Sequence, residues 1–310
     1  MIVTLTANPS VDRTVEVDAL VRGAVLRATG QRVDPGGKGV NVSRALAAHG
    51  VPTCAVLPTG GTEGLQLAQL LEAAGVAVRP VPVVGAVRAN VSIVEPDGTV
   101  TKVNEPGPEL DAAEVAALVA TTVAAAEGSS WVVLSGSLPP GCPDDLYATL
   151  LARLPGPTVL DSSGAPFERA LSAGPALVKP NREELAEVSG LPVRTVGQAV
   201  TAARTLLERG AGAVLASLGA DGAVLLDATG AWYGEAPVDA PVSSVGAGDA
   251  TLAGFLVGGG RGPDALRTAL AFGAAAVKLP GSRMPGPRDI DPCAVVITDA
   301  VPTDRDLKGE

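Results

Sequence analysis

The sequence has little of what membrane-spanning and secreted proteins need. No apolar run approaches the roughly 18 residues that a membrane-spanning helix requires. The first residues, MIVTLTANPSVD, contain neither a basic segment nor a long apolar stretch, so we expect no signal peptide. The three cysteines are scattered and odd in number, which argues against a disulfide framework and favours a reducing, cytoplasmic compartment. We expect them to be small buried apolar residues.

Histidine and lysine are also scarce. The single histidine, His49, and the dispersed cysteines exclude a zinc site or a Ser-His-Asp triad of the usual kind. The formal net charge of −10 makes nucleic acid and anionic membranes poor partners. Of only five lysines, Lys38, Lys102 and Lys179 fall in or beside segments rich in Gly, Asn or Pro. A phosphorylated substrate therefore stays compatible with the composition if basic side chains gather locally.

The 310 residues, 46% of them hydrophobic, suffice for one large α/β domain with a small accessory element, or for two modest domains. Continuous apolar runs alternate with segments of helical spacing, which predicts a mostly parallel sheet with helices on both faces. Such a sheet binds ligands at the carboxyl ends of its strands. The expected strands are 1–7, 53–57, 131–136, 158–163, 176–181 and 213–219; the expected helices are 40–49, 63–74, 111–126, 143–153, 182–189, 196–209, 249–258 and 264–277.

Two segments, about 10–34 and 86–106, do not fit the parallel sheet. They alternate between polar and apolar residues, and 90–94 with 99–103 predicts a hairpin around Pro96-Asp97-Gly98. We expect a small separate β-element that covers a site or pairs with another subunit. The segment 35–39 (PGGKG) predicts a turn, Gly50 a helix C-terminus, and the polar tail 299–310 a frayed end.

The segment 243–249 (SSVGAGD) carries the strongest chemical signal. Glycines just before a helix let backbone N–H groups converge on an anion at the helix N-terminus. Asp249 falls in the first turn of that helix, and a carboxylate beside an anion hole suits phosphoryl transfer. An aspartate of ordinary pKa, near ~3.9, is ionised at pH 7 without tuning. A helix cap after a Gly loop remains the structural alternative.

Three further segments end strands or begin helices with polar or small residues. In 34–41 (DPGGKGVN), glycines permit close approach to a ligand, and the segment fits neither a Walker A loop nor G-x-G-x-x-G. In 179–184 (KPNREE), Asn181 and Glu184 are three apart and suit Mg²⁺ held through its waters. The third, 217–222 (SLGADG), lets the chain pass close to a ligand. Each also fits a plain turn or a solvated helix start.

Taken together, these segments resemble the PfkB family of carbohydrate kinases. The resemblance covers about residues 1–290, with TLTANPSVDRT, PGGKGVNVSRAL, SGSLPPG (135–141), VLDSSG (159–164), VKPNREEL and SSVGAGD in the family's order. It is closest to the branch of 1-phosphofructokinase and tagatose-6-phosphate kinase. It implies one ribokinase-like kinase domain over 1–310, a lid formed by 10–34 and 86–106, a homodimer through that lid, and ATP, Mg²⁺ and K⁺ as cofactors.

The resemblance also implies roles for individual residues. Asp249 would be the catalytic base, with Gly246, Ala247 and Gly248 forming the anion hole. The sugar phosphate would meet Asp12, Arg27, Gly37, Lys38, Asn41, Arg88, Asn90, Lys102 and Ser137. The nucleotide would meet Lys179, Ser217, Gly219, Ala220, Asp221, Gly222 and Gly248. Asn181 and Glu184 would handle Mg²⁺, and the carbonyls of Ser243 and Val245 a monovalent cation, although the partner loop 281–285 matches less clearly.

Several substrates remain open. Fructose 1-phosphate would accept phosphate at C6, whereas tagatose 6-phosphate and fructose 6-phosphate would accept it at C1. The GGKG segment and Asn104-Glu105-Pro106-Gly107 favour fructose 1-phosphate. A nucleoside or ribose kinase would leave the basic residues on the lid without an anion. A sugar-phosphate-binding regulator that has lost catalysis conflicts with the intact GAGD and KPNxxE segments.

Overall fold

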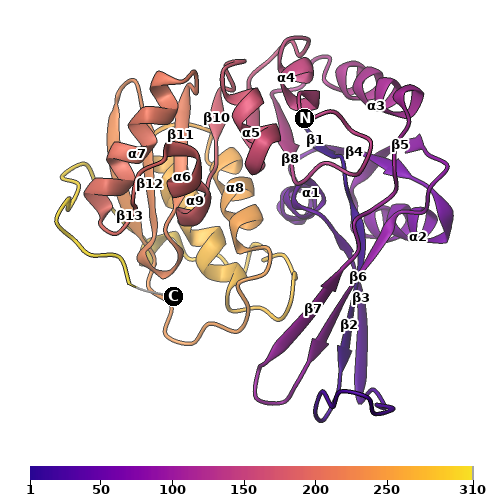
Figure 1. The fold of residues 1–310 in the computed structure, drawn as a ribbon. Coiled ribbons are helices and arrows are strands. Elements are labelled where there is room, and N and C mark those ends of the chain that lie inside the picture. Colours follow the sequence, from indigo (N-terminus) through magenta and orange to yellow (C-terminus); the bar gives the residue numbers. More distant parts are fainter. Residues whose placement is uncertain (309–310) are drawn as a thin grey trace.

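The computed structural model describes residues 1–308, which form two β-sheets (Figure 1). The larger sheet has ten strands in the order β14-β13-β12-β11-β10-β9-β8-β1-β4-β5. Pairing is parallel from β11 to β5 and antiparallel from β11 to β14. The mostly parallel α/β sheet predicted from the sequence is confirmed. Its strands are β1 (Ile2–Thr6), β4 (Thr53–Thr59), β5 (Ala77–Pro82), β8 (Trp131–Ser135), β9 (Thr158–Asp161), β10 (Leu177–Val178), β11 (Ala213–Ser217), β12 (Ala223–Asp227), β13 (Gly230–Glu235) and β14 (Val296–Thr298).

Helices cover both faces of this sheet because successive residues of a buried strand point to opposite sides. Leu134 of β8 belongs to one apolar core and its neighbour Val133 to the other. The first core contains α3 (Ala112–Ala125), α4 (Leu146–Leu151), α5 (Gly164–Leu171), α6 (Arg182–Ser189) and α7 (Val196–Glu208). The opposite face carries α1 (Lys38–Ala48), α2 (Gly61–Ala73), α8 (Ala247–Val257) and α9 (Gly262–Ala276). Within residues 1–308, no helix has the length and apolar character needed to cross a bilayer.

The smaller sheet, which we call the lid, has four strands in the order β3-β2-β6-β7. They are β2 (Ser10–Glu16), β3 (Gly30–Gly36), β6 (Arg88–Val94) and β7 (Val100–Asn104). Two antiparallel hairpins, β2-β3 and β6-β7, join through parallel pairing of β2 with β6. Figure 1 shows the lid extending away from the larger sheet. The separate β-element predicted for 10–34 and 86–106, and its second hairpin, are confirmed.

Some local expectations need correction. Pro35 and Gly36 end strand β3 and α1 begins at Lys38, so PGGKG is a strand-to-helix junction and not a separate turn. Gly50 has φ +69°, as expected for the residue that follows a helix C-terminus. Cys54 is buried as expected, but Cys293 is exposed.

The prediction of a frayed tail is wrong for residues 301–308. Leu307 is buried in the first core, and Asp306 forms a β-bridge with Thr195. The backbone N–H of Lys308 donates to Asp221 Oδ2 at 2.7 Å, and Arg305 pairs with Glu235 at 2.7 Å. The polar side chains of the tail concealed one apolar anchor and a set of backbone hydrogen bonds. Residues 309–310 lie outside the described part.

Candidate active site

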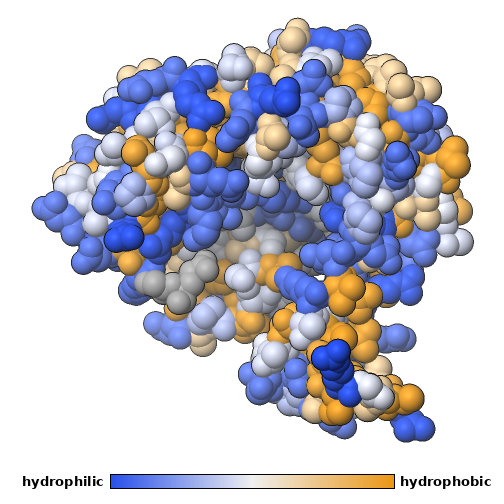
Figure 2. All heavy atoms as spheres, viewed as in Figure 1, coloured by the Kyte–Doolittle hydropathy of each residue, from blue (hydrophilic) through white to orange (hydrophobic). Residues whose placement is uncertain are grey.

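The carboxyl ends of the central parallel strands lie level with one another. The register pairs Thr6 of β1 with Ser135 of β8, and Ser135 with Asp161 of β9. Lys179 directly follows β10, and Asn181 forms a bridge with Ser217 of β11. Segments far apart in the sequence therefore deliver polar side chains to one edge of the sheet, as expected for this class of fold. Figure 2 shows the molecule hollowed between this edge and the lid, with hydrophilic residues around the hollow.

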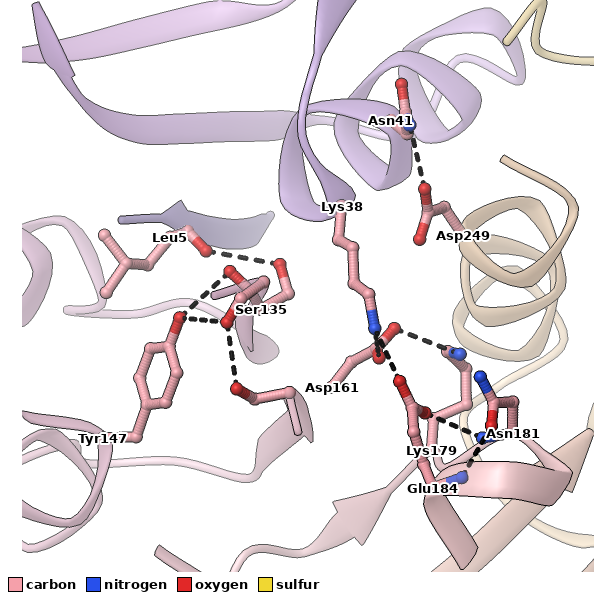
Figure 3. Close-up of polar contacts among 12 residues, drawn as sticks. Leu5, Lys38, Asn41, Ser135, Tyr147, Asp161, Lys179, Asn181, Glu184 and Asp249 are labelled. Atoms are coloured by element: carbon pink, nitrogen blue, oxygen red, sulfur yellow. Dashed lines mark hydrogen bonds and ion pairs between the residues drawn. The ribbon is translucent and has the colours of Figure 1, made fainter. Parts of the chain in front are cut away.

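Asp249 lies in the first turn of α8 and is buried, with 8% of its surface exposed. Its Oδ2 accepts a hydrogen bond of 2.8 Å from Nδ2 of Asn41 on α1 (Figure 3). Gly246 caps the helix at φ +79°, a left-handed conformation that favours glycine, and a Cβ there would meet Met284 Cε at 2.7 Å. The structure thus places the carboxylate beside the N–H groups of a helix N-terminus, where an anion is stabilised.

The environment of Asp249 corrects the expectation of an ordinary pKa. Burial, and then repulsion from the Asp161 carboxylate, raise the pKa of Asp249 to about 6. The Asn41 hydrogen bond and the ammonium groups of Lys179 and Lys38 act in the opposite direction. The carboxylate is therefore mostly ionised at pH 7 but protonates on mild acidification. A base that titrates close to the working pH is well suited to accept a proton.

Asp161 joins the two lysine-containing segments through ion pairs. Its carboxylate is fully buried. It forms ion pairs with Lys38 Nζ at 2.8 Å and with Lys179 Nζ at 3.1 Å (Figure 3). Burial disfavours the charge of Asp161, but the two lysines outweigh burial and lower its pKa. Burial also opposes the charge of Lys38, and Asp161 and Glu184 outweigh it, so the pKa of Lys38 rises. Lys38, expected on the sugar hydroxyls, contacts these two carboxylates instead.

Asn181 and Glu184 form a capping box at the start of α6. Asn181 Oδ1 accepts from the N–H of Glu184 at 2.8 Å, and Glu184 Oε2 accepts from the N–H of Asn181 at 2.9 Å. Glu184 Oε1 has only a long contact, at 3.4 Å from Lys38 Nζ, and the Glu184 side chain is 17% exposed. A carboxylate oxygen whose one protein contact is weak fits Mg²⁺ that keeps its water shell, the mode expected from the sequence. Among residues 1–308, no group of three His, Cys, Asp or Glu side chains gathers to hold an ion directly.

One face of the lid carries polar side chains toward α1. Residues paired across strands share a face, so Asp34, Asp12, Asn90 and Asn104 form one polar row. Asp12 Oδ1 accepts from Asn90 Nδ2 at 3.1 Å, and a Cβ at Gly36 would lie 2.4 Å from the Asp12 carboxyl carbon. A larger residue at Gly36 would therefore displace the Asp12 carboxylate. Of the predicted substrate residues, Asp12 and Asn90 are in contact. Gly37 immediately precedes α1, which carries Asn41, and Asn41 contacts Asp249.

The residues expected to bind the phosphate of the sugar do not contact one another. Arg88 donates to the carbonyls of Asn8 at 2.9 Å and Glu105 at 3.1 Å, which leaves its buried Nε without a partner. Lys102 shares the polar face of the lid but is exposed, as are Arg27, in the connection between β2 and β3, and Ser137 after β8. The structure does not bring these four residues into contact.

The predicted nucleotide segment 217–222 is a tight turn between β11 and β12. The N–H of Leu218 donates to the carbonyl of Gly222 at 2.8 Å, and residues 219–221 form one 3₁₀ turn. Asp221 is buried, and its carboxylate accepts from the tail while its carbonyl accepts from Tyr233 at 2.7 Å. Asp221 therefore supports the turn internally, whereas Ser217, Gly219 and Ala220 remain beside the carboxyl edge.

The two loops expected to hold a monovalent cation lie side by side. Ser282 Cα would be 3.8 Å from a Cβ at Gly246, so the loop 281–285 adjoins the segment that contains Ser243 and Val245. Arg44 of α1 donates to the carbonyl of Ser282 at 3.1 Å. His49 Nε2 lies 3.1 Å from the carbonyl of Pro285, so the sole histidine contacts this loop.

Sequence reasoning missed two residues of this site. Asp161 drew notice only within a strand-end segment, although a polar residue that directly ends a buried strand was the available signal. Arg44 gave no signal, because an arginine on an amphipathic helix resembles a solvated side chain. Each residue has one contact with a segment more than a hundred positions away: Asp161 with Lys38, and Arg44 with Ser282.

A buried carboxylate at a helix N-terminus and two lysines at the adjacent sheet edge suit phosphoryl transfer. The comparisons with known proteins identify the class as a phosphotransferase. The pfkB family carbohydrate kinase model matches residues 5–288. The chain belongs to this PfkB family and is a sugar kinase.

Individual relatives agree with this assignment. A 1-phosphofructokinase of Rhodobacter capsulatus is 38% identical over 307 residues, covering 96% of both chains. An ATP-dependent 6-phosphofructokinase isozyme 2 of Mycobacterium tuberculosis is 37% identical over 290 residues, covering 91% of this chain and 85% of the relative. The structure of phosphofructokinase-2 from Escherichia coli in complex with potassium superimposes with a TM-score of 0.87 at 31% identity, covering 93% of this chain and 96% of that one. The chain is thus similar to kinases of both fructose phosphates.

Proposed function

We propose that this kinase transfers the γ-phosphoryl group of ATP to the C6 hydroxyl of D-fructose 1-phosphate, giving D-fructose 1,6-bisphosphate and ADP. The observation that carries the proposal is Asp249, a buried carboxylate at the start of α8 whose Oδ2 accepts a hydrogen bond from Asn41 (Figure 3). Its pKa of about 6 leaves it ionised at neutral pH. A carboxylate of this kind positions a hydroxyl and accepts its proton as phosphoryl transfer proceeds.

The residues divide the work as follows. Asp249 orients the sugar hydroxyl and takes its proton while that oxygen bonds to the γ-phosphorus and the bond to the β-phosphate oxygen breaks. The N–H groups of Gly248 and Asp249 in the first helical turn, and Lys179, stabilise the charge on the moving phosphoryl group. Bound Mg²⁺ would neutralise charge on the triphosphate, held through water by Glu184 and Asn181. The lid excludes water and so suppresses hydrolysis of ATP.

The polar row of the lid supports a phosphosugar as the acceptor. Asp12 and Asn90 would hold sugar hydroxyls, and the unpartnered Arg88 Nε and Asn90 Oδ1 are buried polar atoms that a ligand would satisfy. Lys102 and Arg27, on the outer part of the lid, would meet the phosphate already on the sugar. The segment 104–107 resembles the 1-phosphofructokinase branch and so favours fructose 1-phosphate. It is held beside β6, where Glu105 Oε2 accepts from the N–H of Ala89 at 2.9 Å and Asn104 pairs with Asn90. Asn104 lies in the same polar row as Asp12, so this segment adjoins the proposed sugar site.

A comparison of acceptors tests this proposal. We expect kcat/KM to be highest for fructose 1-phosphate when it is assayed beside fructose 6-phosphate, tagatose 6-phosphate and unphosphorylated fructose. A preference for tagatose 6-phosphate or fructose 6-phosphate would leave the phosphosugar kinase standing and refute only the choice of sugar. A preference for free fructose or ribose would refute the phosphate-binding role of the lid. ATP turnover that no sugar phosphate increases would favour a regulator over a kinase.

We infer that the carbonyls of Ser243 and Val245 bind K⁺ together with the loop 281–285, because the two loops adjoin and a similar kinase structure contains potassium.

We also infer that the protein forms a homodimer through the lid. The lid face opposite Asp12 carries valines and Ile93, of which Val103 is 57% exposed, and strands β3 and β7 are unpaired edges.

A further inference from the structure

Arg44 has a side chain only 13% exposed and lies at the junction of three segments. Its Nη1 donates to Asn41 Oδ1 at 3.1 Å, to the carbonyl of Ser282 at 3.1 Å and to the carbonyl of Pro35 at 3.3 Å. Its Nη2 lies 4.0 Å from Asp34 Oδ1. A guanidinium carries only donors and stays charged, so every group it contacts must present an acceptor.

This requirement fixes the amide of Asn41. With Oδ1 toward Arg44, Nδ2 is free to donate to Asp249, and it does so at 2.8 Å. Rotation of the amide by half a turn would place two donors face to face at Arg44. It would also place an amide oxygen against the Asp249 carboxylate, where two acceptors repel. Asn41 is 6% exposed, so water is not at hand to relieve either mismatch.

We propose that Arg44 is a positioning residue for phosphoryl transfer, because it holds the Asn41 amide in the one orientation that donates to Asp249. The proposal rests on the proposed role of Asp249 as base. The same guanidinium donates to the carbonyl of Pro35 at the end of lid strand β3 and to the carbonyl of Ser282 in the loop 281–285. The orientation of the Asn41 amide therefore depends on the positions of both segments.

Asp249 and Arg44 have different charged neighbours. Asp249 is influenced by Asp161 on β9, Lys179 after β10 and Lys38 on α1. Burial lowers the pKa of Arg44, while Asp34 and Asp12 of the lid oppose that effect and Arg32 adds to it. Arg44 and Asp249 share Asn41 as a common hydrogen-bonding partner. Arg44 should therefore influence the base mainly through that amide.

The pH dependence of kcat/KM for the sugar phosphate tests this. In the wild type we expect kcat/KM to fall on acidification with a midpoint near the pKa of Asp249, about 6. Arg44→Met should raise this midpoint by about half to one pH unit, the worth of one ordinary hydrogen bond to the carboxylate. Arg44→Gln, whose amide is too short to replace Nη1, carries the same test if the Met variant does not fold. Arg44→Lys, which restores one donor, should recover part of the shift.

A double-mutant cycle separates action through Asn41 from direct charge effects. Asn41→Ala should raise the midpoint by itself, and Arg44→Met in that background should add less than about 0.3 pH unit. Full additivity would mean that Arg44 acts on Asp249 by charge alone, and it would overturn the proposal. Arg267→Met is the matched control, because Arg267 likewise donates from a part-buried guanidinium to a loop carbonyl, that of Val295, but contacts neither Asn41 nor Asp249. It should lower stability and leave the midpoint in place.

A titration of the Asp249 carboxyl carbon by ¹³C NMR, without ATP or sugar, measures the pKa of Asp249 directly. It therefore tests the effect of Arg44 without relying on turnover. An unmoved pKa in Arg44→Met and Arg44→Gln refutes the positioning role even if Asp249 is the base. An active Asp249→Asn enzyme refutes the proposed base instead, and the two failures are therefore distinguishable.

Discussion

Replacing Asp249 by Asn should remove activity and at the same time make the protein more stable at neutral pH. The carboxylate is buried and its pKa is raised from 3.8 to about 6, so the folded state binds this proton more tightly than the unfolded state. The contribution of the protonated carboxyl to the free energy of unfolding is fully present below pH 3.8 and is lost as the pH rises through 6. At about 1.4 kcal/mol per pH unit, the ionised carboxylate costs the fold at most about 3 kcal/mol at pH 7 and above.

The asparagine side chain of this variant is neutral at every pH, and its amide oxygen can still accept from Asn41 Nδ2. In protein free of nucleotide and metal, we therefore expect Asp249→Asn to gain up to about 3 kcal/mol at pH 7.5, or a rise of about 5 °C in Tm. The gain should shrink toward pH 4.5, where the wild-type carboxyl is protonated as well. The variant should lose a factor of about 10²–10⁴ in kcat, the usual worth of a general base.

Asp161→Asn is the matched control because Asp161 is also a buried carboxylate but is paired with two lysines. Lys179 and Lys38 outweigh burial and lower its pKa, so this carboxylate stabilises the fold above its unfolded pKa and loses that effect in acid. Asp161→Asn should therefore destabilise the protein at pH 7.5. Equal destabilisation by the two variants, or a gain for Asp249→Asn that does not change with pH, would refute this account of the buried charge. Activity of Asp249→Asn within threefold of wild type would exclude it as the base.

Four other predictions concern metal, substrate, assembly and stability. Glu184→Gln keeps the capping box but loses the charge that holds the waters of Mg²⁺, so the rate should fall and recover partly at higher Mg²⁺; an unchanged metal dependence would leave Glu184 a helix cap alone. Lys102→Ala should raise KM for the sugar phosphate about ten- to a hundredfold, with a much smaller change for ATP, and equal changes in both would contradict phosphate binding. Sedimentation should show a dimer at micromolar concentration, and a fully active monomer would refute association through the lid. Leu307→Ala should lower the free energy of unfolding by about 2–5 kcal/mol, because this 7% exposed side chain anchors the tail, and a change under about 0.5 kcal/mol would mean that the tail does not contribute.

The elements that the sequence predicted well are those whose burial is uniform. Strand β1 is buried along its whole length and β8 is almost entirely apolar, while α7 follows helical spacing from its Thr195 cap to Glu208. Strand β5 was not anticipated, because Pro80 and Pro82 interrupt its pattern; both prolines are tolerated at the edge of the sheet. The short strands β12 to β14 and helix α5 were likewise missed.

For the site, local motifs predicted which residues matter better than what those residues contact. GAGD identified Asp249 because a glycine loop before a helix has a recognisable local form. The raised pKa of Asp249 could not be foreseen, since it depends on the distance to Asp161 and on burial by segments elsewhere in the chain. The same limit explains Lys38, whose partners Asp161 and Glu184 come from two other elements.

The parallel pairing of β2 with β6 limits how the lid can form during folding and how it can be re-engineered. Ser10 lies beside Arg88 and Glu16 beside Val94, so the lid consists of two insertions that meet only after α1, β4, α2 and β5 have brought the chain back. Neither hairpin is a transplantable module, because deleting one exposes a full strand edge of the other. A graft that exchanges substrate preference between relatives must carry both insertions together, with the register of β2 against β6 preserved along its whole length.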